Sequence, residues 1–150
     1  MLPRDHRLTA SRDFGAVMRR GARAGSSAAV VTVLFREPDA ELASWRGGLI
    51  VSKAVGNAVV RHRTQRRLRH ILAELMAEPG LIPEGVGVDV AVRALQQAPG
   101  TSHEQLLSEV RSAMRRAVKK AQRHRERVER DRAEQPRSEQ PRSEQDRDDA

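Results

Sequence analysis

The spacing of apolar residues along the chain predicts three helices and three strands. In three segments the apolar residues recur every three to four positions, as they do on the buried face of an amphipathic helix. These segments are residues 11–20, residues 57–78 and a long segment from about residue 101 onward. Three other segments are short, apolar and rich in β-branched residues, which is typical of buried strands. They are Ala28–Phe35, Gly48–Ser52 and Val86–Arg93.

The order of these elements, α-β-β-α-β-α, predicts the fold class. Helices and strands in this order form an α+β protein, and the chain has the length of one small domain. We expect a single-domain two-layer sandwich with the helices on one sheet and room for one further short strand. The polar stretch 36–47 predicts a loop that joins a hairpin-like pair of strands, of which Gly48–Ser52 is apolar enough to be central.

Polar and glycine residues mark the expected helix ends. Ser11 is a candidate N-cap for the first helix, and Gly21 is placed to end that helix in the left-handed conformation. Asn57 is a candidate N-cap for the second helix. Either Thr101 or Ser102 is suited to cap the last one.

The C-terminal segment has a different composition from the rest of the chain. Residues 131–150 hold four Arg and seven Asp or Glu, and apart from two prolines they have no apolar side chain larger than Ala. The pentapeptide Glu-Gln-Pro-Arg-Ser occurs twice in succession from Glu134. Such a segment buries too little apolar surface to offset the entropy of ordering. We therefore expect one domain over residues 1–128 and a disordered tail over 129–150, with an inert tail favoured over a tether or solubiliser.

The overall composition narrows the class of protein. The 150 residues carry 28 Lys and Arg against 20 Asp and Glu, a formal charge of +8 at pH 7, and no Cys. A disulfide framework, a thiol nucleophile and a zinc site with Cys ligands are thereby excluded. The sequence lacks an apolar run of membrane-spanning length, and its first charged residue is Arg4. We therefore expect no membrane partner, no secretory signal and a cytoplasmic location. The expected partner of so basic a protein is a polyanion.

The positive charge is concentrated in one segment. From Leu42 to Ala73 there are 32 positions without an acidic residue, and they include seven Lys or Arg. On the predicted helix, Arg63, Arg66 and Arg67 lie on the side opposite the apolar stripe. Arginine engages phosphate with two donors at once and stays charged, whereas an ordinary solvated helix face interleaves Glu with Arg. These observations favour a nucleic-acid site on the second helix. For the basic side of the last helix, a nucleic-acid site and an ordinary solvated face both remain open.

The sequence offers no group for catalysis. The five His residues have no metal-ligand spacing, glycine-rich phosphate loops are absent, and the carboxylates show no pairing. Asp89 lies on the opposite strand face from the valines beside it, which predicts solvent exposure or a salt bridge. Aromatic residues are few: Phe35 is expected in the core, Trp45 is more typical of packing than of base stacking, and Phe14 fits either a core or a platform.

The run from Ile50 to Arg69 resembles the signature of the bacterial ribonuclease P protein subunit. That signature reads Ser-Lys-Lys-x-Gly-Asn-Ala-Val-x-Arg-Asn-Arg-x-Lys-Arg. Arg7-Leu8, Asp13-Phe14, Gly21 and Val92-Arg93-Ala94 also match, so the resemblance covers roughly residues 5–122. The sequence departs from the signature at Ala54, His62 and Gln65 and adds a cation at Arg67.

The resemblance implies a fold and a function. The implied fold is similar to a domain of a ribosomal protein and has a left-handed β-α-β crossover. The implied function is that of the protein subunit of a ribonucleoprotein endoribonuclease, which removes the 5′ leader of precursor tRNA. The RNA subunit performs the chemistry with Mg²⁺ that it holds itself. The protein, a monomer in a one-to-one complex with that RNA, has no catalytic residues and no metal site.

The resemblance also assigns residues. Those that match the signature and are implied to contact the RNA subunit are Lys53, Asn57, Arg61, Arg63, Arg66 and Arg69. We also expect RNA contacts from His62, which stands where the signature has Asn, and from the additional cation Arg67. Those implied to form a cleft for the single-stranded leader are Phe14, Met18, Thr32, Ser52 and Arg93. The alternative is a structural or generic RNA-binding protein of ribosomal type. A DNA-binding helix-turn-helix protein is disfavoured because strands separate the predicted helices.

Overall fold

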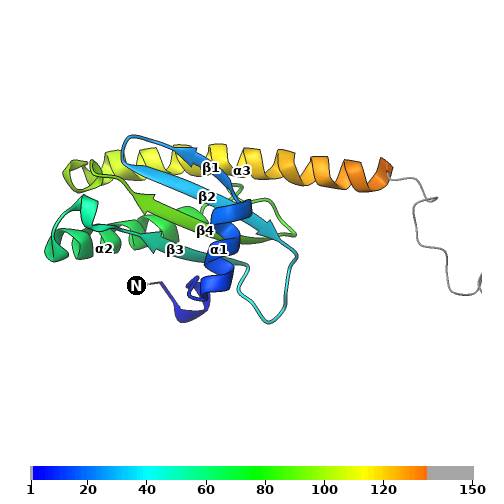
Figure 1. Ribbon diagram of the computed structural model, residues 1–150, viewed down its shortest axis with the longest axis horizontal. Coiled ribbons are helices and arrows are strands. Elements are labelled where there is room, and N and C mark those ends of the chain that lie inside the picture. Colours follow the sequence, from blue (N-terminus) through cyan, green and yellow to red (C-terminus); the bar gives the residue numbers. More distant parts are fainter. Residues whose placement is uncertain (1, 135–150) are drawn as a thin grey trace, which may run out of the picture.

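The computed structural model describes residues 2–134. This part of the chain contains three α-helices and four β-strands (Figure 1). In chain order they are α1 (Ser11–Arg20), β1 (Ala22–Gly25), β2 (Ala29–Arg36), β3 (Trp45–Ile50), α2 (Ala58–Met76), β4 (Gly87–Ala94) and α3 (His103–Glu134). All six predicted elements are present, and β1 is the further short strand.

The strands form one mixed sheet in the order β1-β2-β4-β3. β2 pairs antiparallel with both β1 and β4, whereas β3 pairs parallel with β4. The predicted hairpin-like pair is therefore wrong, because β4 lies between β2 and β3. Gly48–Ser52 is not central either, since β3 is an edge strand. Its apolar character has another cause: Gly47 lies against Leu72 of α2 and Gly48 against the Phe14 ring of α1, so this edge strand is buried on both faces.

The connection between β3 and β4 has the handedness that the resemblance implied. In Figure 1 both strands run toward the left, β4 lies above β3, and α2 returns behind the sheet. This path is a left-handed β-α-β crossover, in contrast to nearly all parallel connections. It places the start of α2 beside the end of β3, so that the basic part of the helix projects from one end of the sheet.

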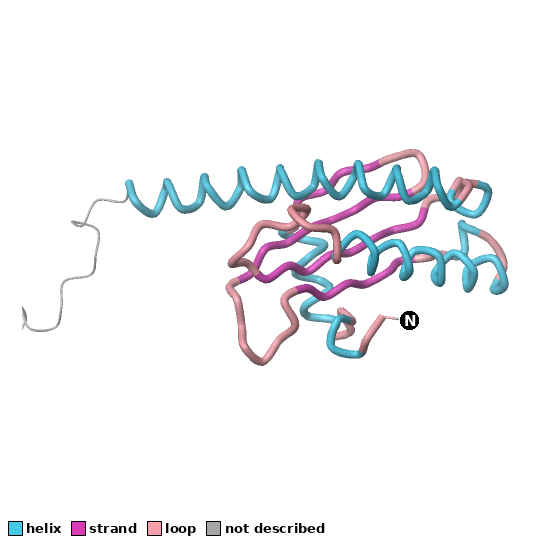
Figure 2. Tube along the Cα trace, turned by 180° about the vertical axis from the view of Figure 1, so that it is seen from behind, coloured by secondary structure: helices cyan, strands magenta, loops and turns pink. Residues whose placement is uncertain are grey.

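The sheet is covered on both faces. α2 and α3 pack on one face, where the main core includes Leu68, Ile71, Val90 and Met114 (Figure 2). α1 crosses the other face and forms a second, smaller buried cluster around Val17. The α+β class with one sheet is confirmed, and α1 on the second face adds a layer to the expected two-layer sandwich. β2 and β4 carry apolar side chains on both faces, and a sheet of this kind needs a cover on each side.

The ends of α1 differ from expectation. Ser11 is the first helical residue rather than the N-cap, and the preceding Ala10 makes no side-chain cap. Gly21 has φ −71° and ψ 154°, which is extended rather than left-handed. A glycine is still required there because a Cβ at position 21 would lie 2.5 Å from the Val17 carbonyl oxygen and 2.6 Å from Cγ2 of Thr32. The chain thus turns from α1 into β1 at a point where the backbone lies too close to Val17 and Thr32 for a side chain, and no left-handed residue is needed.

The last helix extends past the expected end of the domain. α3 continues to Glu134, so the prediction of disorder is wrong for residues 129–134; residues 135–150 lie outside the described part of the chain. The final turns alternate Arg with Glu or Asp, and Nε of Arg125 lies 3.3 Å from a carboxylate oxygen of Glu129. Pairs of opposite charge four residues apart stabilise an exposed helix without any core contact.

We expect Gly48→Ala to destabilise the protein by about 1–3 kcal/mol, because a Cβ at this position would overlap the Phe14 ring that holds α1 on the sheet. The free energy of unfolding from urea titration measures this effect. Gly25→Ala is the matched control, since a Cβ there would lie 3.7 Å from Val30, at ordinary contact distance. Equal stability of the two variants would show that α1 does not need this contact.

Candidate nucleic-acid interface

The start of α2 is shaped by two residues of the signature. Gly56 has φ 155°, a conformation that side-chain-bearing residues rarely adopt, and it turns the chain into the helix. Asn57 is the N-cap, as predicted, and its Oδ1 accepts a hydrogen bond of 2.9 Å from the Val60 amide. The cap and the turn together fix the direction in which the basic turns of α2 leave the sheet.

Four of the basic residues predicted to contact RNA are exposed at this end of the molecule. They are Lys53, in the 3-10 helix Lys53–Val55 just before α2, and His62, Arg63 and Arg66 on α2. Within residues 2–134, none of the four forms an ion pair with a carboxylate. The apolar side of the same helix is fully buried through Leu68, Ile71, Leu72 and Leu75. The helix is therefore held by its core face and directs uncompensated positive charge outward.

The other three arginines of the predicted site are half-buried, and one is already bonded to the protein. Nη1 and Nη2 of Arg67 donate to the carbonyl oxygens of Ala98 and Thr101, at 3.2 and 2.5 Å, and so tie α2 to the segment before α3. Nε of Arg61 is buried and has no hydrogen-bond partner among residues 2–134, and Arg69 is half-buried. Arg67, which the signature does not require, thus has a structural role that sequence reasoning missed.

A small hollow lies on the α1 face of the sheet, where the resemblance implies a cleft for the leader. It has a volume of about 130 Å³ and includes Met18, Thr32 and Arg93 in its lining. Three of the five predicted cleft residues therefore meet. Phe14 instead packs on Gly48 in the cluster under α1, and Ser52 is exposed just past the end of β3. Arg23 of β1 also lines the hollow, and sequence reasoning missed it because β1 was not predicted as a strand.

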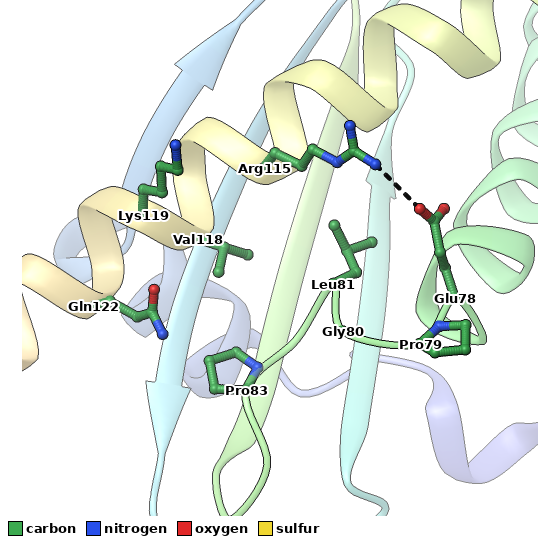
Figure 3. Close-up of a pocket in the computed structure, with 9 residues that line it drawn as sticks. All are labelled: Glu78, Pro79, Gly80, Leu81, Pro83, Arg115, Val118, Lys119 and Gln122. Atoms are coloured by element: carbon green, nitrogen blue, oxygen red, sulfur yellow. Dashed lines mark hydrogen bonds and ion pairs between the residues drawn. The ribbon is translucent and has the colours of Figure 1, made fainter.

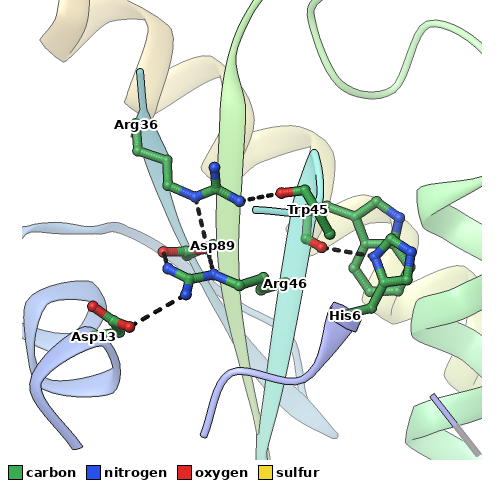
Figure 4. Close-up of polar contacts among 7 residues, drawn as sticks. His6, Asp13, Arg36, Trp45, Arg46 and Asp89 are labelled. Carbon is green, nitrogen blue, oxygen red and sulfur yellow. Dashed lines mark hydrogen bonds and ion pairs between the residues drawn. The ribbon is translucent and has the colours of Figure 1, made fainter. Parts of the chain in front are cut away.

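An ion-pair network beside this hollow holds α1 to the sheet (Figure 4). The carboxylate of Asp89 accepts hydrogen bonds from Arg46 at 2.9 and 2.8 Å and from Nε of Arg36 at 3.1 Å. Arg46 also donates to Asp13 of α1 at 3.2 Å. Hydrogen bonding to Asp89 raises the pKa of Arg46, so this cation keeps its charge at every working pH. Of the two alternatives predicted for Asp89, solvent exposure and a salt bridge, the structure shows the salt bridge, since Asp89 is buried. The sheet register, which pairs Arg46 with Asp89, sets one of its partners.

The N-terminal segment is attached to the edge strand by Trp45. The rings of His6 and Trp45 stack with centroids 4.1 Å apart, and Nδ1 of His6 lies 2.8 Å from the Trp45 carbonyl oxygen (Figure 4). Trp45 is half-buried and packs on the main core. Its predicted packing role is confirmed.

A larger hollow, of about 360 Å³, lies between α3 and the loop that follows α2 (Figure 3). Arg115 lies on the rim of this hollow and pairs with Glu78 at 3.3 Å, so the positive charge of Arg115 is partly compensated. In residues 2–134, no group of three or more metal-ligating side chains comes together, and no helix is long and apolar enough to cross a membrane.

Comparison with known proteins identifies the family. A model of the Ribonuclease P family matches residues 2–118. The chain is 43% identical over 129 residues to the ribonuclease P protein component of Corynebacterium jeikeium, covering 79% of this chain and 98% of that protein. The chain belongs to the ribonuclease P protein family. The corresponding protein of Rhodococcus jostii is 44% identical over 119 residues, with 77% and 91% of the two chains covered.

Solved structures of the family share this fold. The ribonuclease P protein of Staphylococcus aureus matches with a TM-score of 0.60 at 24% identity, over 75% of this chain and 94% of that chain. The protein of Thermotoga maritima gives a TM-score of 0.57 at 23% identity, over 73% and 96%. The fold of the family is therefore retained while about three quarters of the residues differ.

We expect Asp89→Ala to lower the free energy of unfolding by about 3 kcal/mol, because it leaves Arg36 and Arg46 without their counter-charge beneath α1. Urea titration measures the loss. Glu84→Ala, at an exposed position in the loop before β4, is the control and is expected to change stability by less than about 0.5 kcal/mol. A loss no larger than that of the control would mean that the network does not hold α1.

Proposed function

We propose that this chain is the RNA-binding protein subunit of a ribonuclease P holoenzyme that removes the 5′ leader from precursor tRNA. The observation that carries the proposal is the set of four exposed basic side chains at the start of α2, none of which forms an ion pair within residues 2–134: Lys53, His62, Arg63 and Arg66. They occupy positions of the family signature, and the family membership of the chain supports the same role.

The chemistry of these side chains fits an RNA backbone. Phosphates supply the negative charge that the helix lacks, and guanidinium groups engage two phosphate oxygens at once. His62 stands where the signature has Asn, and an imidazole N–H remains a donor to phosphate. Anchoring of α2 by its buried leucines positions these donors before the RNA arrives, which limits the side-chain entropy lost on binding.

In this proposal the RNA subunit and the protein subunit have separate roles, as the family resemblance implies. The RNA subunit performs the hydrolysis with Mg²⁺ that it binds, and the protein contributes binding and orientation. The hollow lined by Met18, Thr32 and Arg93 takes part of the single-stranded leader. Because Met18, Thr32 and Arg93 are not aromatic, contact there depends on phosphate charge and polar groups more than on stacking. One protein monomer binds one RNA, in the cytoplasm.

The alternative function is a structural or generic RNA-binding protein of ribosomal type. It would use the same basic face of α2 and would bind many RNAs with similar affinity, because phosphate contacts carry no sequence information. The family match and the ordered signature over residues 50–69 favour the ribonuclease P role.

Cleavage of precursor tRNA separates the two functions. A 5′-labelled precursor is incubated at low Mg²⁺ with the ribonuclease P RNA of the same organism, with and without the protein. We expect the protein to increase cleavage at the mature 5′ end strongly. Unchanged cleavage, together with equal affinity for that RNA and for an unrelated RNA of the same length, would support the generic RNA-binding protein instead.

We expect Arg63→Ala and Arg66→Ala each to weaken binding to the ribonuclease P RNA about tenfold, and each to reduce the slope of log affinity against log salt by roughly 0.7–0.9, as loss of one phosphate contact predicts. Arg125→Ala is the control, because Arg125 is already paired with Glu129 on a distant part of the fold. Equal small losses in all three variants would contradict the assignment of the site to α2.

A further inference from the structure

The helix α3 carries a second concentration of positive charge, apart from the site on α2. Residues 110–125 include seven Lys or Arg and no Asp or Glu. Residues 126–134, on the same helix, alternate four acidic residues with three Arg. The second stretch has the pattern of an ordinary solvated helix face, and the first does not.

Only some of these cations are compensated. Arg111 and Arg115 share the carboxylate of Glu78, at 3.0 and 3.3 Å, and Arg125 pairs with Glu129. Three other cations are exposed, form no ion pair among the described residues, and have no acidic residue three or four positions away. We call them the α3 ridge: Arg116, Lys119 and Lys120.

Two cations of the α3 ridge are held in place at the outer edge of the sheet. Arg116 donates to the carbonyl oxygen of Gly25 at 2.7 Å, and Lys120 donates to that of Arg23 at 2.8 Å. These carbonyls belong to the edge strand β1, and covering an edge is a known use of Lys. Edge protection does not explain Lys119, which forms no bond with β1 and lines the larger hollow beside Arg115. Glu109, seven residues before Arg116 on the same helix, accepts a hydrogen bond from Ser27.

The α3 ridge is continuous with the hollow on the other face of the sheet. Arg23 provides the link: its side chain lines the hollow beside Met18 and Thr32, while its backbone carbonyl holds Lys120. Because β1 is an edge strand of four residues, a strand of RNA can leave the hollow, pass Arg23 and reach the ridge without crossing any other element. Figure 1 shows α3 running alongside β1 at this edge.

We propose that the α3 ridge binds the phosphate backbone of the part of the 5′ leader that extends beyond the hollow. This inference rests on the proposed function and adds a second, sequence-independent segment to the substrate site. Arg116, Lys119 and Lys120 contact phosphates only, because α3 has no Phe, Tyr or Trp to stack a base. The ridge therefore recognises leader length and charge rather than leader sequence.

The test uses reconstituted holoenzyme and two precursor tRNAs, one with a leader of a few nucleotides and one with a leader several times longer. We expect Lys119→Gln combined with Lys120→Gln to weaken binding of the long-leader precursor about tenfold and to leave the short-leader precursor unchanged. The slope of log affinity against log salt should fall by roughly 1.4 for the long leader only, the value for two phosphates of a single strand. The control is Arg130→Gln combined with Arg132→Gln, which removes two charges from the acid-rich part of the same helix.

Three results would overturn the inference while the proposed function stands. They are an unchanged affinity for both precursors, an equal loss for both, or a loss of affinity for the RNA subunit itself, which would assign the ridge to that RNA. Thermal unfolding of each variant excludes loss of β1 as the cause, and Lys119→Gln alone, which removes no contact with β1, should retain part of the length-dependent loss. If wild-type protein neither binds the RNA subunit nor supports binding of either precursor, the proposed function itself fails.

Discussion

Asp89 lies on the α1 face of the central strand β4, and its nearly buried carboxylate holds Arg46 of the edge strand β3 and Arg36 of β2. Because Arg46 also reaches Asp13, this one anion connects three strands to the first helix. A buried carboxylate is stable only when cations are close to it, and the largely buried guanidinium groups of Arg36 and Arg46 need its negative charge for the same reason. The position of α1, and with it the hollow beside Met18 and Thr32, depends on this network.

The arginines of the chain fall into two groups that composition does not separate. Arg36, Arg46 and Arg67 are bonded to carboxylates or carbonyl oxygens and hold the fold together. Arg63 and Arg66 are exposed and form no ion pair in the described part of the chain, so they are free to meet phosphate. Arg116 of the α3 ridge combines the two, because it is exposed without a carboxylate partner and also donates to the carbonyl oxygen of Gly25. The same type of side chain, arginine, thus serves structure at some positions and RNA recognition at others. The surroundings of each arginine determine which of the two roles it has.

The two RNA-facing surfaces that we propose lie at opposite edges of the sheet. α2 packs beside β3, and the α3 ridge lies beside β1, with the hollow between them on the other face. The two edge strands, β1 and β3, are three strand spacings apart, which is about 14 Å. Such a distance allows one small domain to contact the RNA subunit at one edge and the leader at the other without competition between them.

Local patterns in the sequence determined the helices, most of the strands, the Asn57 cap and the basic face of α2, because each depends on residues close together in the chain. The extended Gly21, the position of β4 between β2 and β3, and the burial of β3 on both faces arise from contacts between distant segments, which spacing alone does not encode. The same holds for the site. The sequence placed Arg67 among the RNA contacts, and only the tertiary structure brought Ala98 and Thr101 to its guanidinium. It also brought Arg23 beside both the hollow and Lys120, because pairing across a sheet joins residues far apart in the chain.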